Sequence, residues 1–327
     1  MDSCAKGPIV ILGAGGIGCY YGARLLAAGQ EVLFVARGAH LAVLQAQGLC
    51  LHHPEFDWQG PVQALDLETL TQRWKPQDIA AVLLCVKATA TESVARALAE
   101  WFDGQGGETM VVSLQNGVDN EPMLVKHLGE SAVIGGLAVR IGGHIVAPGR
   151  IEATGIAQIV AGPWPGSGGA AERQYGERLA WLIEVLCEAG IPARQVDDIR
   201  RELWRKLVIN NGVNPLSALT RMDTRTLSHH SCFSGIVLGL MREAAQAAAA
   251  DGEILSEDDA NEMFELIRNF DPIKTSMLVD LEKGRELEVD AISGTVIERA
   301  DRLGLAVPHS RTVDALLRHQ LEEKAVG

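Results

Sequence analysis

The sequence predicts an α/β domain followed by an all-helical domain. Through the first part of the chain, short runs of consecutive apolar residues alternate with amphipathic stretches of helical period, which is typical of parallel strands covered by helices. From residue 203 onward the apolar residues recur almost only at helical spacing. Because 327 residues are enough for two domains of ordinary size, we expect one domain over 1–196 and a second over 197–327.

The composition limits the classes of protein to consider. Hydrophobic residues make up 47% and charged residues 22% of the chain, which suits a globular protein with two apolar cores. The formal net charge of −13 argues against general binding to nucleic acids. No apolar run approaches the length of a membrane span, and residues 1–6 lack the basic and then apolar pattern of a secretion signal. We therefore expect a cytoplasmic protein that binds neither nucleic acids nor membranes.

Neither the cysteines nor the histidines suggest a metal site. The six cysteines have no ligand spacing and most lie in apolar runs, so we expect mostly buried thiols in a reducing compartment. The adjacent His52 and His53 point in different directions, and no further histidine or cysteine completes a metal spacing. We expect both histidines on the surface.

A glycine-rich turn follows the first predicted strand, which covers 8–12. The turn reads Gly-Ala-Gly-Gly-Ile-Gly over 13–18 and leads into a helical stretch and then a second strand over 30–35. A strand, a GxGxxG turn, a helix and a strand in this order are typical of the dinucleotide-binding unit of Rossmann-type folds. The alternative is a glycine-rich turn that binds nothing, and this context disfavours it.

Three glycines of the turn each have a physical reason. Gly13 allows the tight turn, Gly15 lets the backbone approach a pyrophosphate, and Gly18 lets the helix and the strand pack closely. The N-terminus of the following helix offers N–H groups and a partial positive charge to phosphates. The candidate cofactor-binding residues of the turn are Gly13, Gly15, Gly16, Ile17 and Gly18.

The residue after the second strand indicates which cofactor is bound. An NAD site has Asp or Glu at this place for the ribose hydroxyls, whereas this chain has Arg37. A carboxylate would repel a 2′-phosphate, but a guanidinium can bind it through paired hydrogen bonds. Arg37 therefore favours NADP(H), the alternative being an arginine in a solvated loop.

Two later strands also end in polar residues. The strand expected over 79–86 ends at Lys87, and the strand expected over 109–114 is followed by Asn116 in an Asn-Gly pair. Because ligands of open α/β sheets bind beyond the carboxyl ends of the strands, Lys87 and Asn116 join Arg37 as candidate cofactor-binding residues. The simpler alternatives are a solvated lysine and a turn dipeptide.

The rest of the first domain gives weaker signals. Residues 142–168 are rich in glycine and proline and contain short β-like pieces, which suggests hairpins at a sheet edge. A break in composition over 193–201 precedes the second domain. Helices are expected over 41–47, 91–102 and 170–189.

The second domain opens with a helix that carries three polar residues on one face. Lys206, Asn210 and Asn214 are four residues apart within an apolar helical pattern over 203–214. One charged donor and two amides in a row suit the lining of a cleft that holds a polar substrate. The alternative is a solvated helix face with asparagine at a frayed end.

The remaining sequence of the second domain is almost all helical. Ser256 is typical of an N-cap and is followed by acidic residues, so this acidic run is structural rather than a metal site. Taken alone, Ser276 suggests a cap hydroxyl and Glu288 a carboxylate on a solvated face. Further helices are expected over 236–250, 291–303 and 310–323.

Together, these residues resemble the ketopantoate reductase (2-dehydropantoate 2-reductase) family over nearly the whole chain. The N-terminal part of the resemblance is carried by the glycine turn, Arg37, Lys87 and Gln115-Asn116-Gly117. The more specific C-terminal part is carried by Leu203–Leu207, Asn210, Asn214, Lys274–Met277 and Glu288–Asp290. The resemblance implies a Rossmann-type α/β domain and an all-α domain, with cofactor and substrate in the cleft between them.

The resemblance also implies an activity, namely the NADPH-dependent reduction of 2-dehydropantoate (ketopantoate) to pantoate, a step of pantothenate biosynthesis. Hydride would reach the 2-oxo carbon, and Lys206 would donate a proton to the oxygen. Glu288 would orient the substrate and the lysine and keep the lysine charged. The substrate-binding residues that the resemblance implies are Asn116, Asn210, Asn214 and Ser276.

Two other functions stay open at this point. A reductase or dehydrogenase for another small 2-oxo or hydroxy acid could use the same scaffold, because substrate choice depends on the shape of the pocket. A non-catalytic NADP(H) sensor would need the glycine turn and Arg37 but not Lys206, so the presence of Lys206 weighs against it. The expected partner is a small 2-oxo acid, and the chain is compatible with a homodimer.

Overall fold

The computed structural model describes residues 7–102 and 109–326. The start of the chain at 1–6, including Cys4, lies outside the described residues. By contacts between residues the chain divides into two units. We call the first, Met1–Gln115 with Asn120–Ile199, the α/β unit, and the second, Asn116–Asp119 with Arg200–Gly327, the helical unit.

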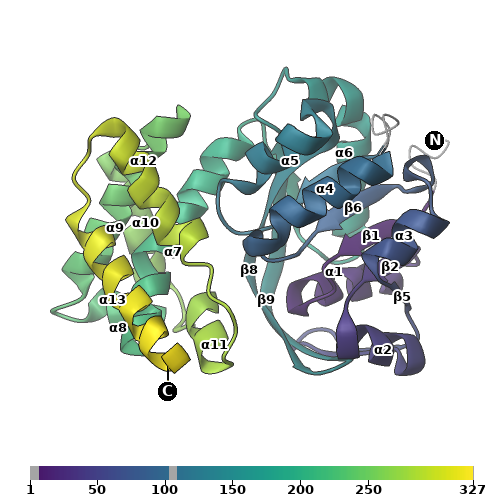
Figure 1. Cartoon of the computed structure of the whole chain (residues 1–327), viewed down its shortest axis with the longest axis horizontal. Helices are drawn as coiled ribbons and strands as arrows, with labels where there is room; N and C mark the ends of the chain where they lie inside the picture. Colours follow the sequence, from purple (N-terminus) through teal and green to yellow (C-terminus); the bar gives the residue numbers. More distant parts are fainter. Residues whose placement is uncertain (1–6, 103–108, 327) are drawn as a thin grey trace. The chain divides into compact units, whose positions relative to one another are not determined.

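The α/β unit is built on one sheet of mostly parallel strands (Figure 1). The strands are β1 (Ile9–Leu12), β2 (Val32–Val35), β3 (Leu49–His52), β4 (Trp58–Gly60), β5 (Gln63–Leu65), β6 (Ala81–Leu84), β7 (Val111–Ser113), β8 (Val133–Ala147), β9 (Arg150–Pro163) and β10 (Ala193–Gln195). Their order is β4-β3-β9-β8-β7-β6-β1-β2-β5, with β10 beside β9. β1 is parallel to both of its neighbours. β2, the next strand in the sequence, lies on one side of β1, and the later strand β6 lies on the other side. This is the switch point at which open α/β sheets bind ligands.

The helices of this unit are α1 (Gly16–Ala27), α2 (Gly38–Gln47), α3 (Leu67–Arg73), α4 (Thr91–Phe102), α5 (Asn120–Leu128) and α6 (Ala170–Glu188). Four of them, α1, α2, α4 and α6, lie where the apolar periodicity predicted helices, whereas α3 and α5 were not predicted. Every residue of β1, β2 and β6 is buried, because each strand is a run of apolar side chains between two layers. The prediction of an N-terminal Rossmann-type domain is confirmed.

The glycine- and proline-rich segment forms one long hairpin inside the sheet, so the prediction of hairpins at a sheet edge was wrong. β8 and β9 pair antiparallel along most of their length, and β8 also pairs with β7 while β9 pairs in parallel with β3. The register shifts between Val139 and Ile141, where Arg140 has a positive φ of 55°. Such irregularities bend a β-ribbon, and Figure 1 shows this one curving past α1.

His53 was also placed wrongly by the sequence analysis. His52 is exposed as expected, but His53 is only 3% exposed. Its Nε2 lies 2.8 Å from the carbonyl oxygen of Gly155 in β9, and its ring packs against Tyr20 of α1. The side chain is buried because the long hairpin covers it, and the sequence pattern around His53 contains no sign of that hairpin.

The helical unit confirms the prediction of an all-α second domain in its described residues. Its helices are α7 (Ile199–Thr220), α8 (Thr224–His229), α9 (Ser234–Ala247), α10 (Glu257–Asn269), α11 (Ser276–Glu282), α12 (Thr295–Leu303) and α13 (Pro308–Val326), with a π-helix, η6 (Asp290–Gly294), before α12. Trp204 of α7 is fully buried, as are Leu240 and Met241 of α9. α7 continues past Pro215 to Thr220, so Asn210 and Asn214 lie within the helix rather than at a frayed end.

An ionic cluster at the start of α10 stabilises the helical unit. Ser256 and Asp259 form a reciprocal capping box, as the N-cap prediction at Ser256 required. The Asp259 carboxylate also accepts hydrogen bonds from Arg201 and Arg205 of α7, at 2.9 Å and 2.8 Å. The backbone N–H of Ser256 is the main cause that lowers the pKa of Asp259, with Arg201 adding to it. The cluster therefore joins α7 to the first turn of α10.

Asp259→Ala should lower the free energy of unfolding by about 1–2 kcal/mol at pH 7, because it removes the capping box and the partner of two arginines. The folded pKa lies below the unfolded value of about 3.9, so this stabilisation is complete above that pH and is lost as the pH falls through the folded pKa. Denaturant titrations at pH 7 and pH 3 measure the difference. Asp258→Ala, in the same turn but exposed, is the control. An equal loss for Asp259→Ala at both pH values would contradict the ionic contribution.

Candidate active site

The glycine turn has the geometry that its three spaced glycines predict. Gly13 has a φ of +107°, and a Cβ there would lie 2.6 Å from the backbone nitrogen of Val86. A Cβ on Gly18 would lie 2.9 Å from a side-chain carbon of Ile11, so only glycine lets α1 pack this closely on β1. Gly15 is the N-cap of α1 and has open space where its Cβ would be. The turn therefore presents open backbone at a helix N-terminus whose first turn has no acidic residue.

Gly16 serves a purpose that the sequence analysis missed. A Cβ on Gly16 would lie 2.0 Å from the carbonyl carbon of Gly143 in β8, and a Cβ on Gly143 would lie 2.8 Å from the carbonyl carbon of Gly16. The two backbones are in direct contact, so the long hairpin supports the first turn of α1. Ile17 is half-buried and packs against the apolar core of the α/β unit. The glycine-rich composition of 142–168 was the available signal, but it does not say which backbone lies opposite.

Arg37 and Lys87 flank the glycine turn at one edge of the sheet. In the register of the sheet, Leu12 of β1 is level with Val35 of β2 and with Leu84 of β6. Arg37 follows β2, is the N-cap of α2 and is exposed. Lys87 follows β6 and is half-buried. Two cations thus lie beside a helix N-terminus at the carboxyl ends of the parallel strands, which is a suitable environment for phosphate groups.

Burial raises the pKa of the two thiols beside the glycine turn, which disfavours their thiolate form. Cys85 follows β6 and is half-buried as a residue, but desolvation of its thiol raises its pKa to about 12. Burial also raises the pKa of the Cys19 thiol, which donates to the carbonyl oxygen of Ala14. The expectation of mostly buried cysteines was wrong, since among the described cysteines only Cys19 is buried, Cys50 and Cys85 are half-buried, and Cys187 and Cys232 are exposed.

The polar face of α7 lies in the middle of the helix. Lys206 and Asn210 are half-buried, while Asn214 is only 3% exposed. The Nδ2 atom of Asn214 donates to the Oγ atom of Ser276 over 3.5 Å. Ser276 is the first residue of α11, and the preceding Thr275 caps this helix, so the Ser276 hydroxyl is not needed as a cap. The structure therefore brings together two of the four candidate substrate-binding residues.

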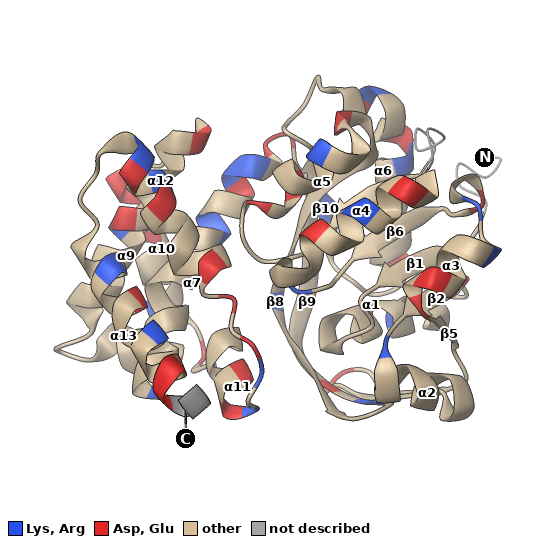
Figure 2. Cartoon of the chain, in the orientation of Figure 1, with Lys and Arg blue, Asp and Glu red and all other residues tan. Residues whose placement is uncertain are grey.

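Asn116 and Glu288 are in contact within the helical unit. The Nδ2 atom of Asn116 donates to the Oε2 atom of Glu288 over 3.2 Å. Glu288 is half-buried and lies just before η6, and short π-helical segments often occur at functional sites. Asp119, three residues after Asn116, accepts a hydrogen bond from Thr295 at 2.8 Å and pairs with Arg299. These contacts fasten the segment after β7 to α12, where Figure 2 shows acidic and basic residues close together.

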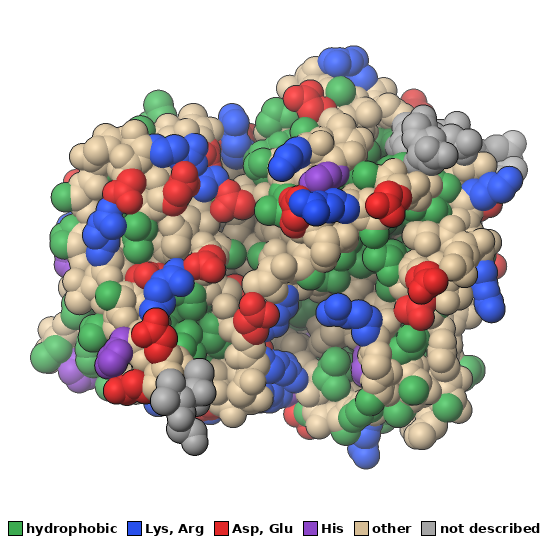
Figure 3. Space-filling view, viewed as in Figure 1, with side chains coloured by type: hydrophobic (Ala, Val, Ile, Leu, Met, Phe, Trp, Pro, Cys, Tyr) green, Lys and Arg blue, Asp and Glu red, His purple; other side chains and the backbone are tan. Residues whose placement is uncertain are grey.

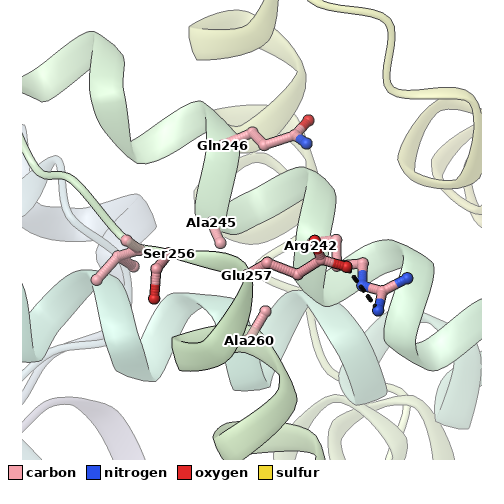
Figure 4. A pocket seen from close by; sticks show the side chains of 7 residues that line it. Arg242, Ala245, Gln246, Ser256, Glu257 and Ala260 are labelled. Atoms are coloured by element: carbon pink, nitrogen blue, oxygen red, sulfur yellow. Dashed lines mark ion pairs between the residues drawn. The ribbon is translucent and has the colours of Figure 1, made fainter.

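A small cavity between α9 and α10 is a separate feature. It has a volume of about 120 Å³ and is lined by Arg242, Ala245, Gln246, Leu255, Ser256, Glu257 and Ala260 (Figure 4). Arg242 and Glu257 form an ion pair of 2.8 Å at its edge. Pockets that bind small molecules usually enclose about 300–1,000 Å³, and none of the candidate residues lines this one. We do not count it as part of the site.

The described residues give two further results. Among 7–102 and 109–326, no three histidine, cysteine or acidic side chains are grouped so that they could hold a metal ion. Within the same part of the chain, no helix has the length and apolar character needed to cross a membrane. On the face shown in Figure 3, positive and negative side chains are interspersed.

Two family models match the chain. The model described as ketopantoate reductase PanE/ApbA matches residues 9–166, and the model described as its C-terminal domain matches residues 198–321. A 2-dehydropantoate 2-reductase of Archaeoglobus fulgidus is 31% identical over 310 residues, which cover 95% of this chain and 96% of that protein.

Solved structures with the same fold also match nearly the whole chain. The crystal structure of a PanE/ApbA family ketopantoate reductase from Ralstonia eutropha JMP134 has a TM-score of 0.82 and 31% identity, and the match covers 98% of this chain and 100% of that chain. A D-mandelate dehydrogenase bound to NADH and anilino(oxo)acetate has a TM-score of 0.84 over 97% of this chain and 99% of that chain. Its identity of 22% indicates a shared fold and no more.

Proposed function

The chain belongs to the ketopantoate reductase family of oxidoreductases, and we propose that it reduces 2-dehydropantoate to pantoate with NADPH as hydride donor, a step of pantothenate biosynthesis. The observation that carries this proposal is the 31% identity to a 2-dehydropantoate 2-reductase over 95% of the chain. Both halves of the chain match the family, which supports the proposal for the cofactor-binding part and the substrate-binding part alike.

The residues at the carboxyl edge of the sheet fit a dinucleotide phosphate. The open space beside Gly15 leaves room for a pyrophosphate at the N-terminus of α1. A side chain at position 15 would occupy that space. Arg37 is an exposed cation where an NAD site has a carboxylate, so it would bind the 2′-phosphate. Lys87 would contribute a second cation from the neighbouring strand end, at the nicotinamide half of the cofactor, where Asn116 would contact the nicotinamide and the substrate. When bound, NADPH supplies the hydride.

Lys206 is the residue that we assign to proton transfer. Reduction of a 2-oxo group leaves negative charge on the former carbonyl oxygen, and an ammonium group can stabilise that charge and then protonate the oxygen. Glu288 is assigned as the carboxylate that favours the charged form of Lys206. Glu288 also accepts a hydrogen bond from Nδ2 of Asn116, so the carboxylate has a second task, namely to hold the Asn116 amide in one orientation.

Asn210, Asn214 and Ser276 are assigned to the substrate. An amide offers both donors and an acceptor without adding charge, which suits the hydroxyl and the carboxylate of a small hydroxy acid. The contact between Asn214 and Ser276 supports a joint role, because a hydroxyl that accepts from an amide can turn its own proton toward a carboxylate.

Steady-state oxidation of NADPH with a panel of 2-oxo acids tests the proposal. The panel contains ketopantoate, pyruvate, oxaloacetate, 2-oxoisovalerate and benzoylformate, the last being the 2-oxo acid that corresponds to mandelate. The highest kcat/KM should be found with ketopantoate. A clear preference for another acid would favour a different substrate on the same scaffold. NADPH binding without turnover of any acid would favour a sensor.

Arg37→Asp should lower the ratio of kcat/KM with NADPH to kcat/KM with NADH by at least about tenfold, because it exchanges a partner of the 2′-phosphate for a group that repels it. The ratio is measured for the wild type and for the variant with the same preferred acid. Arg73→Asp, which makes the same charge change at an exposed position of α3, is the control and should leave the ratio unchanged. An unaltered ratio in Arg37→Asp would show that the cofactor assignment of Arg37 is wrong.

A further inference from the structure

A buried chain of hydrogen bonds joins the first residue of α4 to the end of β7 and to the first residue of α5. The Nε2 atom of Gln115 donates to the Oγ1 atom of Thr91 over 2.7 Å, and that hydroxyl donates to the Oδ1 atom of Asn120 over 2.8 Å. Ser113 donates to the Oε1 atom of Gln115 over 3.5 Å. None of these four side chains is more than 3% exposed. The Thr91 hydroxyl is the link, because it accepts from one amide and donates to the other.

The linking group at Thr91 has to be a hydroxyl. A hydroxyl can donate and accept at the same time, whereas a methyl group can do neither. Without the hydroxyl, Nε2 of Gln115 and Oδ1 of Asn120 would each lose this partner in a place that water does not reach. The two amides would then have to turn or move to find other partners.

The linked residues bound the two loops that carry candidate site residues. Lys87 lies four residues before Thr91, and the short 3₁₀ turn η2 (Ala88–Ala90) fills the interval. Asn116 directly follows Gln115, and the turn that begins there ends at Asn120, the first residue of α5. β6 and β7 are parallel neighbours, so both loops leave the same edge of the sheet. The hydroxyl of Thr91 therefore ties the Lys87 loop to the Asn116 turn.

We propose that Thr91 is a positioning residue for the reaction, which fixes the end of the Lys87 loop to Gln115 and Asn120, the residues that bound the Asn116 turn. The proposal rests on the proposed function, in which Lys87 and Asn116 contact the nicotinamide half of the cofactor and the substrate. The glycine turn and Arg37, which would bind the other half, have no member in the hydrogen-bond chain. Loss of the Thr91 hydroxyl should thus affect one half of the cofactor site only.

Thr91→Val, which keeps the shape and removes the hydroxyl, tests the proposal. It should lower kcat with ketopantoate by about tenfold, since small displacements of positioned groups slow catalysis. It should also raise the Kd for NADPH while leaving the Kd for adenosine 2′,5′-bisphosphate unchanged. Thr91→Ser should restore both values. Ser93→Ala removes an exposed hydroxyl from the same turn of α4 and should change neither.

A purely structural role for Thr91 would give a different result. It would lower the Tm and the active fraction of Thr91→Val, with wild-type kcat and Kd in the folded fraction, and this outcome overturns the proposal. Equal weakening of NADPH and of the bisphosphate fragment, or no recovery in Thr91→Ser, also overturns it. The two Kd values need no turnover, so they decide the question even if the wild type reduces none of the acids and the proposed function fails.

Discussion

Lys206→Ala should lower kcat by about 10²–10⁴-fold, which is the usual contribution of a general acid. The Kd for NADPH should stay close to that of the wild type, because the lysine is assigned to the substrate oxygen and not to the phosphates. Steady-state kinetics with ketopantoate gives kcat, and fluorescence titration gives the Kd. Lys206 is half-buried in the middle of α7, so the Tm is recorded to exclude a general loss of folding.

Two further variants make the Lys206 result specific. Lys206→Arg keeps the charge, but a guanidinium does not give up its proton near neutral pH, so it should bind substrate better than the alanine variant and still react slowly. Lys283→Ala removes an exposed lysine of the same unit and should react like the wild type. A kcat for Lys206→Ala within a few fold of the wild-type value would remove Lys206 from the catalytic role.

The architecture could be predicted because it depends on local patterns. Buried parallel strands need consecutive apolar residues, so β1, β2 and β6 are visible as short runs in the sequence. The bounds of α4 and α6 follow from apolar residues at helical spacing. A hairpin was predicted in this segment, but its place inside the sheet was not, because that place depends on partners elsewhere in the chain, namely β3 and β7. His53 was missed for the same reason, since the hairpin is what covers it.

In the candidate site, too, features that depend on local spacing could be predicted from the sequence, whereas contacts between distant residues could not. The shared face of Lys206, Asn210 and Asn214 is a consequence of their spacing on one helix. The hydrogen bond between Asn116 and Glu288 spans 172 residues of sequence, and no local pattern indicates which polar groups the fold brings together at that distance. The Thr91 hydroxyl was invisible too, because a threonine at the start of a helix is usually explained as a cap.

Glu288→Ala should lower kcat/KM by about 10²-fold, because the carboxylate has been assigned two tasks. In the proposed mechanism it keeps Lys206 charged. It also accepts a hydrogen bond from Asn116, and the loss of this bond in a partly buried place is costly. Glu286→Ala, two residues earlier and exposed, is the matched control and should have little effect.

Double-mutant cycles separate the two tasks of Glu288. If Glu288 acts through Lys206, the variant lacking both side chains should be hardly slower than Lys206→Ala, because residues that act as one unit give losses that do not add. If it also holds Asn116, the cycle with Asn116→Ala should show the same shortfall from additivity. Additive losses in the first cycle and a shortfall in the second would make Glu288 a positioning residue for Asn116 alone. Additive losses in both cycles would mean that Glu288 acts independently of both residues, and the catalytic assignment made for it here would then be wrong.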